Sequence, residues 1–276
     1  MALLTLLTDF GLDDYYVAAV KGTILRLAPG SQLVDVSHQV PPGDIETAAF
    51  LLAAALPSFP PGTVHLAVVD PGVGSSRRIL AARTDGNPAR PPSWVVAPDN
   101  GLLTLLVPIL PSIRAVERSD LFLAAPGQTF HGRDRFAPVA AWLLRGERGE
   151  ELGPEIDDAV RLDVEPPRRE PGGIRGRVAH VDRYGNLVTD IPWSWLPAAP
   201  SNGVEVGSAP DSHGTDRRVT HYAEIPPGEA AFLPGSLGTI ELSMNGADLA
   251  RKWNVGRGAA VRITLDASPG DRVTLR

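Results

Sequence analysis

The residues best suited to chemistry stand in the stretch Val68-Val69-Asp70-Pro71-Gly72-Val73-Gly74-Ser75-Ser76-Arg77-Arg78. A carboxylate ends a short apolar run, a glycine-rich turn follows it, and two guanidinium groups come next. Such a turn lets Asp70 and Arg77 converge on one small volume. That volume suits a structural ion pair, an anion site or a site for an activated water. The segment lacks the lysine and the glycine spacing of a P-loop, and Asp70 would repel a phosphate, so we favour the water site.

Two further carboxylates follow apolar runs in the same way. Asp9 comes after Leu3–Leu7, and Asp99 comes after Trp94–Ala97. In an open parallel sheet, ligands bind at the carboxyl ends of strands, which is where all three aspartates are expected. Asp9 has two interpretations. It either caps the helix that follows, or it accepts hydrogen bonds from two vicinal hydroxyls such as those of a ribose.

His131 stands beside glycine in Phe130-His131-Gly132-Arg133-Asp134, in what reads as a loop before a helix. It has no second histidine or carboxylate at the spacing of a metal site other than Asp134, so we expect no metal here. The segments 182–186 and 243–246 read as turns, in which Asp182, Asn186 and Asn245 are ordinary turn formers. The remaining histidines are interpreted as packing or surface residues: His38, His65, His180, His213 and His221.

Composition excludes several classes of protein. The 276 residues are 43% hydrophobic and 21% charged, which is typical of a globular protein. The net charge of −6 argues against a nucleic-acid partner, and the absence of cysteine excludes disulfides, thiolate metal sites and a cysteine nucleophile. We see no signal peptide at the N-terminus and no apolar run long enough to span a membrane. A cytoplasmic protein without a membrane partner is therefore expected.

The pattern of apolar residues predicts an α/β N-terminal domain with a largely parallel central sheet, over residues 1–165. Its predicted strands are Leu3–Leu7, Gln32–Val36, Val64–Val69, Ile79–Ala82 and Trp94–Ala97, and its predicted helices are Asp14–Leu27, Asp44–Leu56 and Phe136–Leu144.

A polar, proline-rich segment, 146–173, reads as a linker between domains. Beyond it we expect a smaller β-rich, barrel-like domain over residues 172–276. Its predicted strands are Arg175–Val181, Asn186–Ile191, Arg218–Ile225, Gly238–Met244, Ala260–Leu265 and Arg272–Leu275, with one short helix at Ala247–Trp253.

Five motifs together resemble one family, the S-adenosyl-L-methionine (SAM) hydroxide adenosyltransferases, which are adenosine-forming SAM hydrolases related to fluorinase and chlorinase. The motifs are Thr8-Asp9-Phe10-Gly11, Val69-Asp70-Pro71-Gly72-Val73-Gly74 with Arg77, Ala97-Pro98-Asp99-Asn100-Gly101-Leu102, Phe130-His131-Gly132-Arg133-Asp134, and Asp182-Arg183-Tyr184-Gly185-Asn186. The resemblance runs in order from about residue 3 to the C-terminus. It implies a homotrimer whose active sites lie between the N-terminal domain of one subunit and the C-terminal domain of a neighbour.

The resemblance also implies roles for single residues. Asp70, Arg77 and His131 match the set that handles the water, and the fluorinase-like branch lacks the aspartate and the histidine of this set. It leaves Arg78 as a structural neighbour. The implied substrate-binding residues are Asp9 at the ribose hydroxyls, Asp14 near the methionine amino group, Asp182 and Asn186 at the methionine end, and Asn100 and Asn245 near the substrate.

The expected reaction is hydrolysis of SAM to adenosine and L-methionine, by in-line attack of an activated water on carbon 5′ of the ribose. SAM is the substrate, and we expect no cofactor. Two alternatives stay open. One is a SAM-dependent enzyme of the same fold that uses a halide as nucleophile, and the other is a protein that binds SAM or adenosine without turnover.

Overall fold

The computed structural model describes residues 2–85, 92–125, 127–198, 203–207 and 211–265. The chain forms two compact units, 1–163 and 164–276. The sequence pattern predicts this boundary slightly later, between 165 and 172. Within the described ranges, none of the helices combines the length and the hydropathy that a membrane crossing requires.

The first unit is built on a six-stranded sheet with the order β2-β1-β3-β5-β4-β6. The strands β2, β1, β3 and β5 are parallel, whereas β4 runs antiparallel to both of its neighbours. The predicted α/β class with a largely parallel sheet is confirmed. The strands are β1 (Leu3–Thr8), β2 (Gln32–Ser37), β3 (Val64–Val68), β4 (Ile79–Arg83), β5 (Trp94–Pro98) and β6 (Ser112–Ala115).

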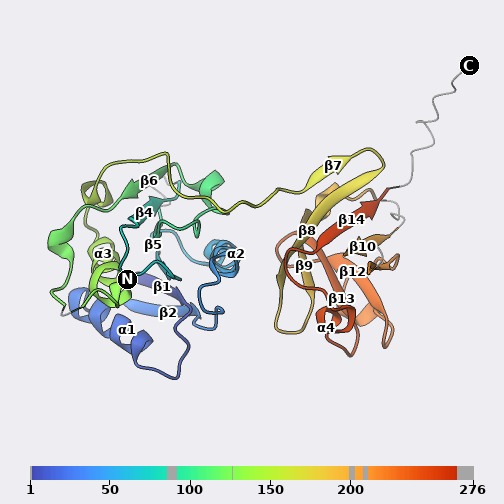
Figure 1. The fold of residues 1–276 in the computed structure, drawn as a ribbon, viewed down its shortest axis with the longest axis horizontal. Coiled ribbons are helices and arrows are strands. Elements are labelled where there is room, and N and C mark those ends of the chain that lie inside the picture. The colour runs from blue at the N-terminus through green and yellow to red at the C-terminus, as the bar shows by residue number, and fades with distance from the viewer. Residues whose placement is uncertain (1, 86–91, 126, 199–202, 208–210, 266–276) are drawn as a thin grey trace, which may run out of the picture. The chain divides into compact units, whose positions relative to one another are not determined.

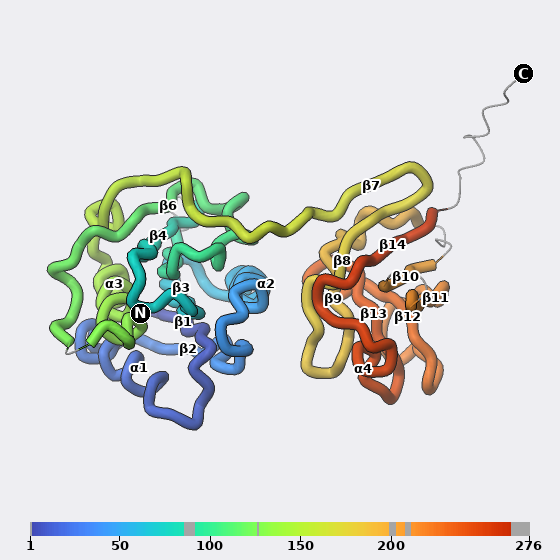
Figure 2. Tube along the Cα trace, in the orientation of Figure 1, coloured from blue at the N-terminus to red at the C-terminus, as the bar shows by residue number. Residues whose placement is uncertain are grey.

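Helices cover both faces of this sheet. The helices are α1 (Tyr16–Leu27), α2 (Ile45–Ala55) and α3 (Ala137–Leu144), with a π-helical turn at Gly132–Phe136 that runs directly into α3. Figures 1 and 2 show α1 and α3 on one side of the sheet and α2 on the other. Two apolar cores result, one under α1 and α3 and one under α2. Residues within one strand alternate between these cores, as the period of two in a strand requires.

Local sequence explains where these helices begin and end. Asp44 caps α2, because its carboxylate accepts hydrogen bonds from the backbone N–H and the hydroxyl of Thr47. The helix α1 stops at Leu27 before Pro29-Gly30, and Gly30 has a φ of +82° that favours glycine. Because β1, β3 and β5 are parallel, their carboxyl ends bring Asp9, Asp70 and Asp99 to one edge of the sheet.

Most of the segment that the sequence predicts as a linker is folded against the first unit. Leu152 and Ala159 are buried in its cores. The backbone N–H of Val160 donates to Asp99 at 2.8 Å, and that of Leu162 donates to Thr104 at 2.8 Å. The linker prediction for 146–163 is therefore wrong. The polar, proline-rich composition of the segment did not reveal its specific contacts with the first unit.

The second unit is an antiparallel eight-stranded sheet with the order β11-β10-β14-β8-β9-β13-β12 and β7 paired with β8. Its two end strands, β11 and β12, lie close to each other, as the hydrogen bond from the Thr215 hydroxyl to the carbonyl of Ala230 at 2.7 Å shows. The sheet is therefore nearly closed into a barrel. The predicted barrel-like class is confirmed. The elements are β7 (Arg168–Glu170), β8 (Gly173–Val181), β9 (Leu187–Pro192), β10 (Val204–Val206), β11 (His213–Thr215), β12 (Ala230–Pro234), β13 (Thr239–Met244), β14 (Ala260–Thr264) and α4 (Leu249–Trp253).

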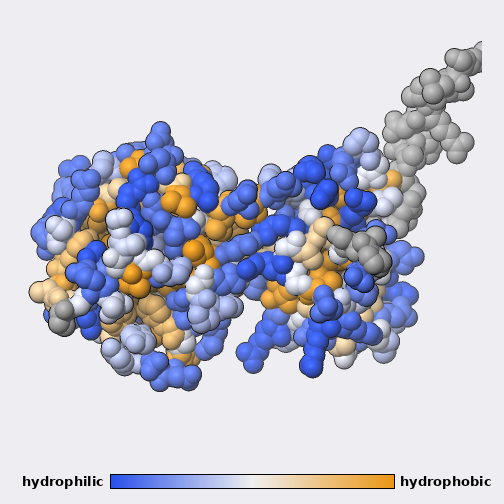
Figure 3. Space-filling model, viewed as in Figure 1, coloured by the Kyte–Doolittle hydropathy of each residue, from blue (hydrophilic) through white to orange (hydrophobic). Residues whose placement is uncertain are grey.

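One predicted strand of this unit is wrong. In the range 218–225, the strand pairing is limited to an isolated bridge between Arg218 and Phe232, and a 3₁₀ turn over Tyr222–Glu224 replaces the strand. The strand predicted at 272–275 lies outside the described residues. Inside the barrel, β8, β9, β13 and β14 supply a buried apolar core. On the face seen in Figure 3, each unit shows mostly hydrophilic side chains with smaller hydrophobic patches between them.

Candidate active site

The turn after β3 brings a carboxylate and a guanidinium together. Asp70 lies two residues beyond the end of β3, and Arg77 lies two residues before β4. The turn between them is closed by hydrogen bonds from Val73 N–H to the Asp70 carbonyl and from Ser75 N–H to the Gly72 carbonyl. Gly74 has a φ of +87°, which a residue with a side chain rarely adopts. The glycine-rich sequence thus allows the chain to reverse within seven residues.

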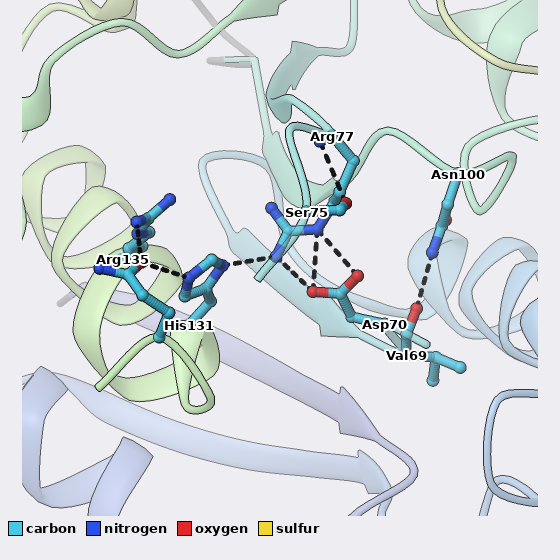
Figure 4. A network of polar contacts seen from close by, with 8 residues as sticks. Val69, Asp70, Ser75, Arg77, Asn100, His131 and Arg135 are labelled. Atoms are coloured by element: carbon cyan, nitrogen blue, oxygen red, sulfur yellow. Dashed lines mark hydrogen bonds and ion pairs between the residues drawn. The ribbon is translucent and has the colours of Figure 1, made fainter. Parts of the chain in front are cut away.

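Asp70, Arg77 and His131 form a continuous hydrogen-bonded chain (Figure 4). Arg77 Nε lies 2.8 Å and 2.9 Å from the two carboxylate oxygens of Asp70, and Arg77 Nη2 also donates to Asp70 Oδ2. The same Nη2 lies 2.9 Å from His131 Nδ1. The Asp70 and Arg77 side chains are 5% and 8% exposed, so solvent screens this pair little.

The contacts of His131 assign its tautomer. Arg77 has only donors, so His131 Nδ1 must accept and the ring proton lies on Nε2, which is 3.3 Å from Gln128 Oε1. Burial, followed by the positive charges of Arg135 and Arg77, lowers the pKa of His131 below its ordinary value. The uncharged ring is therefore the form that this site favours.

His131 is not in a loop, as its neighbouring glycine led us to expect. It is buried and directly precedes the π-helical turn Gly132–Phe136. Gly132 lies close to two aromatic rings, because a Cβ there would stand 3.2 Å from Phe10 and 3.5 Å from Phe130. Gly132 is therefore required by close packing in a helical segment. The local sequence alone does not distinguish such a glycine from one in a loop.

Asp70 and His131 line one pocket together with Asp9, at the carboxyl edge of the sheet. The Asp9 carboxylate accepts a hydrogen bond from Gly43 N–H at 2.8 Å. Asp9 does not cap the following helix, since α1 begins after Tyr15 without a side-chain cap. This excludes the capping interpretation of Asp9. The pocket is lined by Asp9, Phe10, Tyr15, Tyr16, Val68, Asp70, Val73, Thr129, Phe130, His131 and Gly132.

The aromatic residues of this pocket were not singled out in the sequence. The rings of Tyr16 and Phe130 are 5.1 Å apart and nearly perpendicular, and Phe10 also meets Phe130 edge to face. Single aromatic residues at the start of a helix and before a histidine carry no signal of their own. Only the fold gathers them into one wall.

Other predicted site residues of this unit lie outside the pocket lining. Asp14 is exposed. Asn100 donates from its side-chain amide to the carbonyl of Val69 at 2.9 Å, and so supports the residue before Asp70. Arg78 donates to Asp99 at 2.6 Å and to Asp158 at 2.8 Å, which makes it a structural neighbour of the Asp70–Arg77 pair.

In the second unit, Asp182, Asn186 and Asn245 line a separate pocket. Asp182 accepts from the backbone and the side-chain amide of Asn186, and Asn186 accepts from the Ser243 hydroxyl at 2.6 Å. Asn245 donates to the carbonyl of Ile225 at 2.7 Å. The lining residues are Asp182, Tyr184, Asn186, Tyr222, Ile225, Ser243, Met244, Asn245, Gly246 and Ala247.

Two acidic groups and a phenol meet beside this second pocket. The Tyr222 hydroxyl donates to the buried carboxylate of Glu241. Burial raises the pKa of Glu241, and the charge of Asp182 adds to that increase. Burial and the hydrogen bond to Glu241 also raise the pKa of Tyr222. This pair could not be predicted from the sequence, because Tyr222 falls in a segment predicted as a strand.

The polar residues of these pockets do not resemble a metal centre. Among the residues that the structure describes, no group of three or more histidines, aspartates or glutamates is arranged to hold a metal ion.

Two family models cover most of the chain. The N-terminal domain of the SAM hydroxide adenosyltransferases matches residues 4–153, and the C-terminal domain of the same family matches residues 176–262.

Similar proteins cover nearly the whole length. An (R)-S-adenosyl-L-methionine hydrolase from Thermus thermophilus is 40% identical over 93% of this chain and 97% of its own length. The corresponding protein of Salinispora tropica is 39% identical over 93% of this chain and 95% of its own length. A fluorinase from an Actinoplanes species is 28% identical over 95% of this chain and 97% of its own length. The crystal structure of an uncharacterized conserved protein from Thermotoga maritima has a TM-score of 0.84 at 33% identity, over 95% of this chain and 99% of that one.

Proposed function

Because this chain belongs to the SAM hydroxide adenosyltransferase family and is an adenosine-forming SAM hydrolase, we propose that Asp70, Arg77 and His131 hold its attacking water. The reaction converts SAM and water into adenosine and L-methionine. The bond between ribose carbon 5′ and the sulfonium sulfur breaks, and its electron pair stays on the sulfur of methionine. A bond from carbon 5′ to the water oxygen forms, and one proton is released.

The hydrogen-bonded chain of Asp70, Arg77 and His131 is the observation that carries this assignment. Arg77 binds both oxygens of Asp70, yet an ionised carboxylate has about four acceptor positions, so Asp70 keeps capacity to accept from a water. Arg77 Nη1 is buried and has no hydrogen-bond partner among the described residues, so the positive charge of this guanidinium is not fully compensated by hydrogen bonds. Asp70 would orient the water, while Arg77 would favour its hydroxide character.

Alignment supplies much of the catalysis in this proposal. Methionine is already a good neutral leaving group, so the site needs a placed nucleophile more than a strong acid. Asp9 would hold the two ribose hydroxyls so that the water attacks in line with the bond that breaks. Such orientation is worth on the order of 7 kcal/mol or more.

The remaining site assignments are proposals of the same kind. Asp182 and Asn186 would meet the methionine end of SAM, with Asn245 near the substrate, and their support is that all three line one pocket. Asp14 would approach the methionine amino group, and Asn100 would act near the substrate. We also propose a homotrimer with sites shared between subunits, a reaction without any cofactor and a cytoplasmic location.

Product analysis in labelled water tests the proposed function. The protein is incubated with SAM in H₂¹⁸O, and adenosine and methionine are measured by mass spectrometry. We expect equal amounts of both, with the label in the 5′-hydroxyl of adenosine. Added fluoride or chloride should give no 5′-halo-adenosine. If no adenosine forms, or if Asp70→Ala and His131→Ala leave its rate unchanged, the proposal is wrong.

A further inference from the structure

A second polar network lies next to Asp9, and its residues have no role in the reaction proposed above. His38 directly follows β2 and is only 4% exposed. Its ring Nδ1 lies 2.8 Å from the hydroxyl of Thr8, and its Nε2 lies 3.1 Å from Asp35 Oδ1. Lys21 of α1 donates to the other oxygen of Asp35 at 2.6 Å. The network thus connects α1, β2 and the end of β1.

One arrangement of protons satisfies all of these contacts. The Thr8 oxygen accepts from Phe10 N–H at 3.3 Å, so the Thr8 hydroxyl can donate to His38 Nδ1. His38 Nε2 then carries the ring proton and faces Asp35 Oδ1 at the ion-pair distance of 3.1 Å. Burial alone would raise the pKa of Asp35, but the hydrogen bonds from Lys21 and His38 outweigh it and lower that pKa. Asp35 is therefore a charged acceptor that fixes the orientation of the ring.

The backbone of His38 holds the same segment from a second point. Its carbonyl accepts from Gly11 N–H at 2.8 Å, and Gly11 has a φ of +66°. Thr8 and Gly11 are thereby fixed on either side of Asp9. Further along the same loop, Gly43 N–H donates directly to Asp9, and a Cβ on Gly43 would lie 3.7 Å from Pro71. The loop from His38 to Gly43 therefore contacts both the Asp9 turn and the residue after Asp70.

We propose that His38 is a positioning residue for the ribose, because its ring and its carbonyl fix Thr8–Gly11 with the Asp9 carboxylate directed at the ribose hydroxyls. This inference rests on the role proposed above for Asp9. His38 touches neither the substrate nor the water in this scheme, and it acts only through the segment that carries Asp9.

Two substitutions separate the contacts of the ring. In His38→Asn the side-chain carbonyl can still accept from Thr8, in the place of Nδ1. In His38→Gln the side-chain amide can still donate to Asp35, but the acceptor for Thr8 is lost. We expect kcat/KM for SAM to fall about fivefold to tenfold in His38→Gln and less in His38→Asn, as the loss of one hydrogen bond implies.

A substrate without ribose hydroxyls distinguishes a positioning role of His38 from a purely structural one, because only a positioning role makes the loss of kcat/KM depend on those hydroxyls. For the 2′,3′-dideoxy analogue of SAM, Asp9 has no hydroxyl to hold, so the His38 variants should lose less than about twofold in kcat/KM. Thr8→Val removes the other partner of Nδ1 and should reproduce His38→Gln, which keeps the test valid if one variant does not fold.

His65 offers a matched control in the same sheet. Its Nδ1 lies 2.8 Å from the hydroxyl of Thr5, and it is equally buried, but its partner Thr5 lies in the middle of β1 and not next to Asp9. His65→Asn should reduce stability without changing the preference for SAM over the dideoxy analogue. If His38→Gln lowers kcat/KM for both substrates by the same factor, His38 is structural only and the inference fails.

Failure of the proposed function is distinguishable from failure of this inference. If the wild-type protein does not cleave SAM, the proposed function fails first. Calorimetric binding of adenosine and of 2′,3′-dideoxyadenosine then tests His38 independently of turnover. A weaker preference for adenosine in His38→Gln supports the inference, whereas an unchanged preference overturns it.

Discussion

At the scale of single residues, Arg77 is the centre of the candidate site. It binds both oxygens of Asp70 and also donates to His131, so it couples two groups from distant parts of the sequence. Its guanidinium also lies 5.0 Å from the centre of the Phe136 ring, which restricts it further. The pairing of Asp70 with Arg77 was predictable, because both stand on one short turn. The contact with His131 was accessible only through the family resemblance.

The role of Asp70 is tested by Asp70→Asn, which keeps the size of the side chain and removes its charge. We expect kcat/KM for SAM to fall about 100-fold or more, since the water loses a charged acceptor. The rate of adenosine release measures this. Asp158→Asn is the control, because Asp158 is 69% exposed and pairs with Arg78 instead. A loss in Asp158→Asn as large as that in Asp70→Asn would contradict the assignment.

His131 should give the reaction an acid limb at unusually low pH. Protonated Nδ1 is a donor and cannot accept from Arg77 Nη2, so this hydrogen bond would be lost. Activity should therefore fall as His131 becomes charged. Burial and the charges of Arg135 and Arg77 lower its pKa from 6.5, so the midpoint in kcat/KM against pH should lie below 6.5.

Arg135→Gln tests the cause of that shift. It removes one of the charges that lower the pKa of His131, so the midpoint should move up towards 6.5. In His131→Asn the remaining activity should show no such limb. An acid limb that keeps its position in Arg135→Gln and persists in His131→Asn belongs to another group.

At the scale of elements, the short turn between β3 and β4 sets the geometry of the site. Gly74 within it has a φ of +87°, and a Cβ there would lie 3.3 Å from the carbonyl of Gln128. Gly74→Ala should therefore cost about 1 kcal/mol or more in the free energy of unfolding and also disturb the Asp70–Arg77 pair. We expect a fall in kcat/KM beyond what the loss of stability explains.

Gly30→Ala is the matched control for this turn. Gly30 has a φ of +82°, but it lies after α1 with open space around the position of a Cβ. Both variants should lose similar stability in thermal unfolding, and only Gly74→Ala should lose activity. Equal activity in the two variants would show that the geometry of the turn does not govern catalysis.

The burial of His65 should make the first unit less stable in acid. His65 on β3 is buried, and burial lowers its pKa to about 4 from 6.5. The unfolded chain then binds a proton more readily than the folded one, so stability is full above pH 6.5 and falls as pH decreases towards 4. The shift corresponds to about 3 kcal/mol. Hydrogen exchange of the β1 and β3 amides, corrected for the intrinsic rate, measures it.

His65→Asn should flatten this dependence, since asparagine does not titrate and can still accept from Thr5. The control is His221→Asn, because His221 is 61% exposed and lies in the second unit. That variant should leave the pH dependence of the first unit unchanged. If His65→Asn also leaves it unchanged, other groups account for the loss of stability in acid.

The sequence predicts some elements better than others for physical reasons. The strands β1, β3 and β5 are mostly apolar, and each is followed within a few residues by a glycine, so their ends were predicted to within one residue. The segment 218–225 has the alternating pattern of a strand, but it contains a 3₁₀ turn at Tyr222–Glu224. Contacts with distant residues, such as the hydrogen bond from Tyr222 to Glu241, determine its structure, and the local pattern does not contain them. Strands of three residues, such as β10 and β11, bury too few side chains to give a local pattern.

At the scale of the whole molecule, both fold classes were predictable because each rests on many residues. The alternation of buried strands and helices predicts a layered α/β unit, and repeated short strands predict a β-rich one. The near closure of the barrel depends on contacts such as that between Thr215 and Ala230, which no local pattern contains. Similarly, the two pockets gather residues from three or more separate segments each.

The proposed sharing of active sites between subunits predicts complementation between two inactive variants. Asp70→Asn disables the first unit and Asp182→Ala disables the second. If each site combines the first unit of one subunit with the second unit of a neighbour, mixed trimers contain some sites with both halves intact. Random exchange of equal amounts gives about a quarter of the sites, so about a quarter of the wild-type rate should return. Mixing after partial denaturation and refolding, with the mass followed by sedimentation, measures both quantities. Each variant refolded alone is the control, and a mixed trimer without recovered activity would mean that each site belongs to a single chain.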